Sequence, residues 1–180
     1  MNSERKAVTG SLGGVLVPIL FLSLLTAGGC GLLRSKPPKV DLGDITVFVD
    51  CDANEDSAIP FEIVLVSDPA LLNRLAEMPA SQWFTKREEL LRTFPKGIES
   101  QGHWEVVPGQ RVPRIKGAEF RGKRALGVFL FADYLPKGAH RARLDTYRDG
   151  VVVRFERDNF TLSKPGAQAL PVGTASACTD

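Results

Sequence analysis

The sequence has few of the residues from which most enzymatic and metal sites are built. It holds two histidines and three cysteines in 180 residues, and these do not form a group with the spacing of metal ligands. Neither His103 nor His140 is accompanied by a nucleophile and a carboxylate in a recognisable triad order. Glycine-rich phosphate loops are also missing from the folded part of the sequence. We therefore expect a protein that is not an enzyme and has neither a metal nor a small-molecule substrate.

An excess of charge of one sign is missing as well. The chain has 23 basic and 21 acidic residues, a formal net charge of +2, and such a balance is not typical of proteins that bind nucleic acids or anionic membranes. The only dense basic run is Arg121–Arg124. It has no interleaved aromatic residues on which bases could stack, so a solvated loop is favoured over a binding patch. No nucleic-acid partner is expected.

A long apolar run of the kind that spans a membrane is also lacking. The apolar run Val15–Leu25 is interrupted by Pro18 and is short against the roughly 20 residues that a membrane helix needs. It follows a basic stretch and ends at Ala27-Gly28-Gly29-Cys30. A basic start, an apolar centre and small residues before a cysteine are typical of a lipoprotein signal peptide. A secretory signal without lipid and a retained membrane helix are the less favoured alternatives.

This interpretation assigns residues 1–29 to the signal peptide and makes Cys30 the lipid-modified first residue of the mature protein. Each buried methylene of an acyl chain contributes roughly 0.8 kcal/mol, so two or more chains give a stable anchor. Gly31 follows the cysteine where aspartate would favour retention in the inner membrane of Gram-negative bacteria. We therefore expect the periplasmic face of the outer membrane, with the covalent lipid on Cys30 as the one non-protein group and no other cofactor.

Cys51 and Cys178 are the two cysteines that remain. An even pair in an exported chain is more often a disulfide than two free thiols. We therefore favour a disulfide, which would join the C-terminal tail to the end of the first strand.

The mature chain divides by its apolar pattern. Residues 30–44 have no periodicity and are expected to form an extended tether, residues 45–164 the folded domain, and residues 165–180 a tail. Apolar residues alternate in 45–49 and 61–65, which predicts strands. Helical spacing at about 68–94 predicts an insertion of two short helices, and strands return from His103 onward. The fold expected is a mainly β sandwich of about seven or eight strands with a two-helix insertion.

The polar, acidic loop 52–60 joins the first two predicted strands. The alternate spacing of a calcium loop is shared by four residues, Asp50, Asp52, Asn54 and Asp56. However, Glu55 stands where the sharp turn of such a loop requires glycine, and Phe61 where a bidentate glutamate is needed. A solvated or partner-binding loop is therefore favoured over a calcium site.

Several segments occur in an order that is characteristic of one protein family. They are the cysteine and short tether, the strands 45–51 and 61–67, the sequence Ala80-Ser81-Gln82-Trp83-Phe84, and the segments 104–110 and 126–134. In these features the mature chain resembles the TssJ family, the outer-membrane lipoproteins of type VI secretion systems. The basic stretch 137–143 and the long tail that ends in Cys178 depart from the family pattern.

The resemblance implies a transthyretin-like β-sandwich that tethers the membrane complex of the secretion system to the outer membrane. In that family the loop between the first two strands contacts the periplasmic domain of the large inner-membrane component. Carried over to this sequence, the contact residues would be Asp52, Asn54, Glu55, Asp56 and Ser57.

Two other classes of function stay open at this point. One is a lipoprotein that binds or chaperones a different envelope complex, which the same fold and anchor would serve. The other is an exported enzyme that uses His103 or His140, which requires a deep pocket containing one of them.

Overall fold

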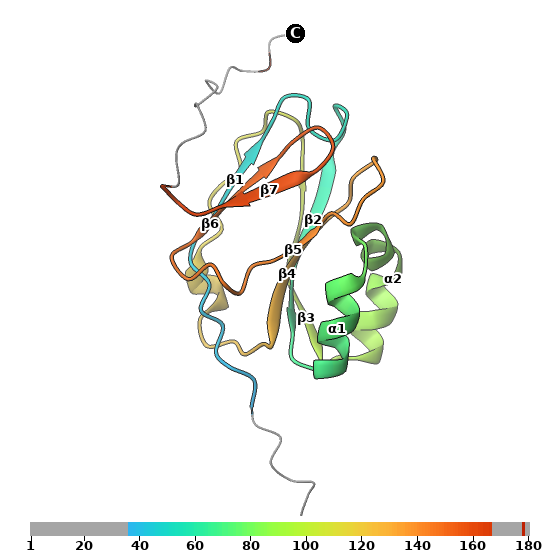
Figure 1. Cartoon of the computed structure of the whole chain (residues 1–180), viewed down its shortest axis with the longest axis vertical. Helices are drawn as coiled ribbons and strands as arrows, with labels where there is room; N and C mark the ends of the chain where they lie inside the picture. The colour runs from blue at the N-terminus through green and yellow to red at the C-terminus, as the bar shows by residue number, and fades with distance from the viewer. Residues whose placement is uncertain (1–35, 167–177, 179–180) are drawn as a thin grey trace, which may run out of the picture. The chain divides into compact units, whose positions relative to one another are not determined.

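The described part of the chain is a β-sandwich of one three-stranded and one four-stranded sheet (Figure 1). The computed structural model describes residues 36–166 and Cys178. The first sheet has the order β1-β6-β7, in which β1 and β6 run parallel and β6 and β7 antiparallel. Its strands are β1 (Ile45–Val49), β6 (Val151–Phe155) and β7 (Phe160–Ser163).

The second sheet is antiparallel throughout and has the order β3-β2-β4-β5. Its strands are β3 (Ile98–Val106), β2 (Ile59–Val66), β4 (Gly127–Ala132) and β5 (Arg141–Arg143). The sequence-based prediction of a mainly β sandwich with a two-helix insertion is confirmed.

β2 is apolar at almost every position because both of its faces are covered. Phe61, Ile63 and Leu65 point into the core between the two sheets, whereas Val64 and Val66 belong to a second core under the helices. Successive side chains of a strand point to opposite faces, so a central strand between two apolar layers has no polar face.

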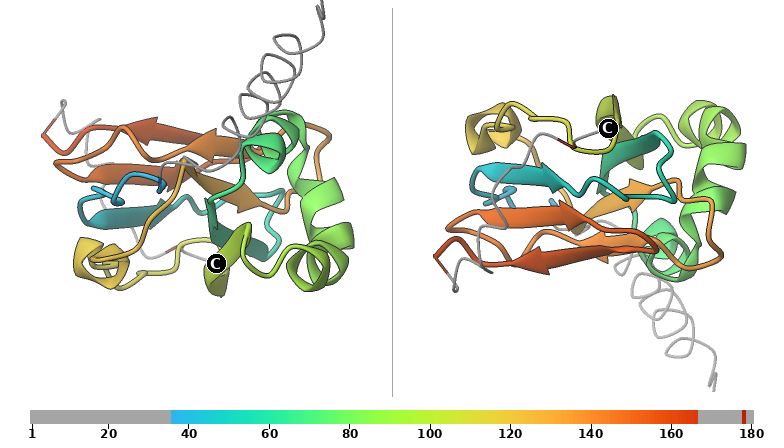
Figure 2. Two further views of the ribbon diagram at one scale, coloured as in Figure 1. Left: turned by 90° about the horizontal axis from the view of Figure 1, so that it is seen from below. Right: turned by 90° about the horizontal axis from the view of Figure 1, so that it is seen from above.

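Two helices, α1 (Pro69–Glu77) and α2 (Ala80–Thr93), cover the outer face of the four-stranded sheet (Figure 2). The side chain of Asp68 caps α1 by accepting hydrogen bonds from the backbone N–H groups of Ala70 and Leu71. Trp83 of α2 is fully buried and stacks on Phe131 of β4, with ring centroids 5.1 Å apart. Neither helix, nor any other in the described residues, is long and apolar enough to cross a bilayer.

The strand boundaries differ from the predicted ones at the edges of the sheets. β3 begins at Ile98, before the predicted start at His103. Residues 107–116 form no strand, although Ile115 exchanges two backbone hydrogen bonds with Ile45. β5 is limited to Arg141–Arg143. Because β3 and β5 are edge strands, much of their surface stays exposed and no strict apolar alternation marks their ends.

Residues 37–44 belong to the folded domain, although the sequence predicts a tether as far as Asp44. The backbone N–H of Val40 donates to the carbonyl of Lys123 (2.9 Å), and the carbonyl of Pro38 accepts from Ala125 N–H (3.1 Å). Leu42 is 6% exposed and lies in the sandwich core. At Gly43 an added Cβ would clash with the backbone of Gly150, so the chain can pack here only without a side chain.

Both hydrophobic cores consist of residues between Leu42 and Phe160. A chain that starts at Gly31 therefore contains every residue of the two cores and both cysteines of the disulfide. We expect such a chain to fold on its own.

Candidate functional site

The predicted contact loop joins β1 to β2 at one end of the sandwich (Figure 1). Asp52, Glu55 and Asp56 are exposed, and Ser57 is half-buried. None of these three carboxylates forms an ion pair with another residue that the structure describes. The loop thus presents to solvent negative charge that no described residue neutralises.

Three consecutive residues of the loop adopt a left-handed backbone conformation. Asn54, Glu55 and Asp56 have φ angles of 51°, 54° and 61°. For residues with a side chain this conformation costs on the order of 1 kcal/mol each, least for Asn and Asp. Such strain persists only where the surroundings fix the backbone, and it clusters at functional sites.

Asn54 is the residue that fixes the loop. Its side chain is buried, with 1% of the residue exposed. Its Nδ2 donates to the carbonyl of Ala58 (2.8 Å), and its Oδ1 accepts from the backbone N–H of Leu135 (2.6 Å). The amide of Asn54 thus ties the β1–β2 loop to the β4–β5 loop. Its predicted contact with a partner stays a prediction.

An ion pair supports the start of the loop. Arg154 of β6 donates from Nε to both carboxylate oxygens of Asp50, at 2.8 and 3.0 Å. The hydrogen bond to this carboxylate raises the pKa of Arg154 above its usual range. Asp50 is therefore already engaged and is not a free ligand at the head of a calcium loop.

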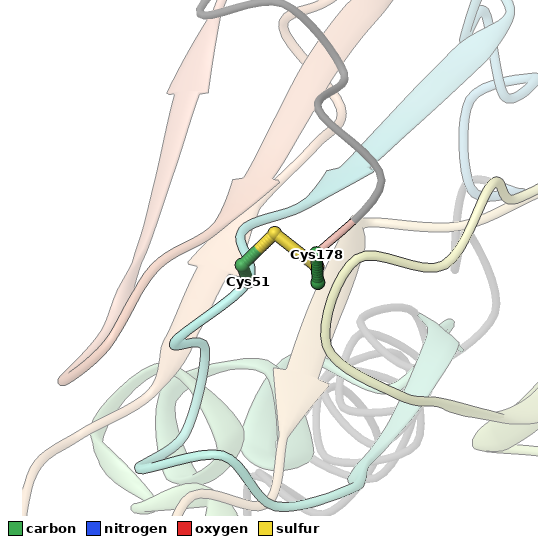
Figure 3. The surroundings of a disulfide bond; sticks show 2 residues. All are labelled: Cys51 and Cys178. Atoms are coloured by element: carbon green, nitrogen blue, oxygen red, sulfur yellow. A yellow bond between two sulfur atoms is a disulfide. The ribbon is translucent and has the colours of Figure 1, made fainter. Parts of the chain in front are cut away.

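The structure joins Cys51 and Cys178 in a disulfide with a Cα–Cα distance of 5.5 Å (Figure 3). Gly109, in the segment that follows β3, packs against it: an added Cβ would clash with Sγ of Cys178, and the φ angle is +69°. The N–H of Gly109 donates to the carbonyl of Asp50 (3.1 Å). The disulfide joins two segments at the base of the loop, and the segment around Gly109 packs against them as a third. The sequence alone does not indicate this role of Gly109.

Two exposed apolar side chains flank the acidic loop. Leu135, whose N–H binds Asn54, is 65% exposed, and Val107, directly after β3, is 50% exposed. β2, which follows the loop, lies between β3 and β4, and the register pairs Val106 of β3 with Ile59 at the start of β2. Val107 therefore lies on the β3 side of the loop and Leu135 on the β4 side. Neither residue can be identified from the sequence, because an isolated apolar residue next to a turn carries no periodic signal.

His140 is a structural residue of the β4–β5 loop. Its ring stacks on Tyr134 with centroids 4.7 Å apart, and its Nε2 lies 2.8 Å from the carbonyl oxygen of Pro136. The hydroxyl of Tyr134 donates to the carbonyl of Asn159 (2.7 Å), and burial raises the pKa of Tyr134 above its usual range. Burial also raises the pKa of the neighbouring Asp133 carboxyl. These contacts hold the backbone to which Asn54 is tied.

His103 lies on β3 with its side chain 51% exposed, and its Nδ1 is 3.9 Å from Oε2 of Glu62. A surface groove of about 290 Å³ lies at the opposite end of β1 and is lined by residues 40–44 together with Gly117, Ala118 and Arg121. Neither histidine lines this groove. The enzyme alternative, which requires a pocket around one of them, gains no support from this geometry.

A buried carboxylate joins the helices to the sheet. Glu62 of β2 is 0% exposed, and its Oε2 accepts from Trp83 Nε1 (3.0 Å) and Arg87 Nε (2.8 Å). The hydrogen bond from Arg87 to Glu62 raises the pKa of Arg87. Oε1 has no hydrogen-bond partner among the described residues. We interpret the cluster as a structural contact between the two layers, which sequence analysis did not identify.

Cys30 and the signal peptide lie outside the described residues, so the structure does not bear on the lipidation site. The positions that it does describe separate the predicted contact residues into two kinds. Asp52, Glu55 and Asp56 are exposed, whereas Asn54 positions them.

The described fold is similar to that of solved lipoproteins of type VI secretion systems. The lipoprotein TssJ1 from Pseudomonas aeruginosa superposes with a TM-score of 0.51 at 10% identity, over 67% of this chain and 92% of that chain. Lip from Serratia marcescens, a membrane-bound component of the type VI secretion system, gives a TM-score of 0.47 at 14% identity, over 67% of this chain and 95% of that chain. No protein-family model matches the sequence, and no curated protein matches it significantly. The likeness to TssJ1 confirms the predicted transthyretin-like β-sandwich.

Proposed function

We propose that this protein is a lipoprotein of a type VI secretion system that tethers its membrane complex to the outer membrane. Acyl chains on Cys30 hold it at the periplasmic face, and the β1–β2 loop binds the periplasmic domain of the large inner-membrane component. The observation that carries the proposal is the rigid acidic loop, fixed by buried Asn54, on a sandwich with the fold of the type VI secretion lipoprotein TssJ1.

The shape of the loop supports a binding role. A loop that is held in its bound conformation before contact loses little entropy on association, and affinity rises accordingly. Here a left-handed turn is kept in place by the partly buried hydrogen bonds of Asn54 and by a disulfide at its base. The strain is retained although glycine would relieve it, and this favours a functional role for the residues present.

The charge of the loop indicates the chemistry of its partner. Asp52, Glu55 and Asp56 are exposed and unpaired among the described residues, so a complementary surface would carry Arg or Lys side chains. Leu135 and Val107 add apolar area beside these charges. We expect the partner to place basic residues on the loop and apolar residues on the two flanking positions.

The mechanism is mechanical and involves no reaction. The acyl chains fix one end of the protein in the membrane, and the loop holds the partner at the other. Several copies that bind one assembly raise the overall avidity beyond that of a single contact.

The test is binding of a soluble chain, Gly31–Asp180, to the periplasmic domain of the organism's large type VI inner-membrane protein. The loop variant carries Asp52→Asn, Glu55→Gln and Asp56→Asn, which removes charge and keeps side-chain size. A matched control carries Glu77→Gln, Glu89→Gln and Asp149→Asn, three exposed acids outside the loop.

We expect the unaltered chain and the control to bind, and the loop variant to lose at least tenfold in affinity, since truncating charged contacts changes binding by a few kcal/mol. Equal binding by the loop variant would refute the contact surface. If the folded, disulfide-bonded chain does not bind at all, the proposed partner is wrong, and a different envelope complex becomes the leading alternative.

A further inference from the structure

Two basic segments that are far apart in the sequence lie side by side in the structure. Lys39 and Arg124 form a β-bridge, and Nη1 of Arg124 donates to the carbonyl of Pro37 (2.8 Å). The hydrogen bonds between Val40 and Lys123 and between Pro38 and Ala125 continue this pairing. The pairing assembles a basic surface, here called the tether-side surface, that comprises Lys36, Lys39, Arg121, Lys123 and Arg124.

Most of this charge is not neutralised within the domain. Lys36, Lys39, Arg121 and Arg124 are exposed, and none of them pairs with a carboxylate among the described residues. Only Lys123 has such a partner, Glu99 at 2.6 Å, and this hydrogen bond lowers the pKa of Glu99.

The acidic residues near the tether-side surface are engaged elsewhere. Asp41 lies 3.5 Å from Arg148, and Asp44 contacts Lys116 (3.5 Å) and Arg114 (3.8 Å). Glu119 accepts a hydrogen bond from the backbone N–H of Lys116 (3.3 Å). At the tip of the basic loop Gly122 has open space around it. The surface is therefore positive and accessible.

The position of this surface points to a membrane. It lies at the beginning of β1, whereas the acidic contact loop follows the end of β1, so the two occupy opposite ends of the sandwich (Figure 1). If Cys30 carries the lipid, the six residues to Lys36 can span at most about 20 Å. Pro37 is already bound to the domain through Arg124, so the basic surface lies within this distance of the lipidated residue.

We propose that the tether-side surface binds the anionic headgroups of the phospholipid leaflet in which the protein is anchored. The inference rests on the lipidation that is part of the proposed function and adds a second contact with the membrane. Each Lys or Arg side chain near an anionic bilayer raises the partition coefficient of a protein between water and that bilayer about fivefold. The contact holds the domain upright, so that the β1–β2 loop points away from the membrane toward its partner.

The experiment measures binding of the chain Gly31–Asp180, which lacks the lipid, to vesicles. One set contains equal parts of phosphatidylglycerol and phosphatidylethanolamine, and the other contains phosphatidylcholine alone. The surface variant carries Lys36→Gln, Lys39→Gln and Arg121→Gln, because no other residue of the described structure accepts a bond from these side chains. The matched control removes the same charge elsewhere by Arg111→Gln, Lys137→Gln and Arg157→Gln.

We expect binding to the anionic vesicles only, with loss at high salt as screening increases. The surface variant should bind about 100-fold more weakly, and the control should change little. The proposal would be overturned if both variants lost binding equally or if the chain bound both kinds of vesicle equally. A preference for isolated peptidoglycan over anionic vesicles would also overturn it.

The two proposals can fail separately. The vesicle experiment contains no protein partner and no lipidated cysteine, so a negative result leaves the function of the acidic loop untouched. The surface variant should still bind the inner-membrane component, because its substitutions lie at the opposite end of β1.

Discussion

The buried amide of Asn54 fixes the backbone of the exposed acidic loop. We expect Asn54→Gly to lower the free energy of unfolding by about 2 kcal/mol, because two partly buried hydrogen bonds of about 1 kcal/mol each are lost while glycine keeps the left-handed backbone. The variant should also bind the proposed partner more weakly, since the loop is no longer held. Urea unfolding and a binding titration measure the two effects.

Glu55→Gly is the control for this prediction. Glu55 has the same backbone conformation as Asn54, but its side chain is exposed. The free energy of unfolding of the Glu55→Gly variant should therefore change by less than about 1 kcal/mol. If Asn54→Gly were as stable as Glu55→Gly, the hydrogen bonds of the amide would have no role in fixing the loop.

The Glu62 cluster leads to a second prediction for single residues. Removal of one member of a buried ion pair costs about 3–5 kcal/mol, because it leaves the other charge without compensation. Arg87→Met should approach this cost, since Glu62 is fully buried and would keep only the hydrogen bond from Trp83. Arg92→Met, an exposed position on the same helix, should stay within about 0.5 kcal/mol. Denaturant unfolding of both variants decides whether the pair carries this energy.

The disulfide and the segment around Gly109 act together at the level of structural elements. The bond closes a sequence separation of 127 residues, and in the chain-entropy model a loop of this length contributes about 4–5 kcal/mol. We therefore expect the double variant Cys51→Ser, Cys178→Ser to unfold at a clearly lower urea concentration. The same variant should bind the proposed partner less well, because Cys51 stands at the base of the loop.

Gly109→Ala tests whether the disulfide packs as described. Alanine at this position would meet Sγ of Cys178 and would have a positive φ angle. Gly109→Ala should therefore lower the free energy of unfolding more in the disulfide-bonded protein than in the double serine variant. A double-mutant cycle measures this difference. Equal effects in both backgrounds would show that only the backbone angle matters.

The sequence is sufficient to predict those elements whose burial is regular. β2 and both helices follow from their apolar periods because each presents a continuous face to a core. The first residues of β3 and residues 37–44 could not be placed, since their positions depend on pairing with Val66 and Lys123, which are distant in sequence. Likewise the acidic loop was identified from its composition, but the burial of Asn54 depends on where the β4–β5 loop lies.

Charge is distributed unequally over the domain, although the net charge of the 180-residue chain is only +2. In the part of the chain that the structure describes, acids without an ion-pair partner lie in the loop after β1, and bases without one lie where the chain enters β1. Net charge alone therefore hides a polarity that the fold creates by joining residues 36–39 to residues 121–124. With the lipid that we propose on Cys30, a domain of this polarity would be suited to a membrane at one end and a basic partner at the other.

The residue after Cys30 is expected to decide in which membrane the protein is anchored. Because aspartate after the lipidated cysteine favours retention in the inner membrane, Gly31→Asp should move the full-length protein from the outer-membrane to the inner-membrane fraction of a Gram-negative host. Gly31→Ser serves as the control and should leave the protein in the outer membrane, whereas Cys30→Ser should prevent lipidation altogether. Density-gradient separation of the two membranes, followed by immunodetection, distinguishes the variants. Retention of the Gly31→Asp protein in the outer membrane would contradict the sorting hypothesis, and a lipid-modified Cys30→Ser protein would contradict the assignment of the anchor.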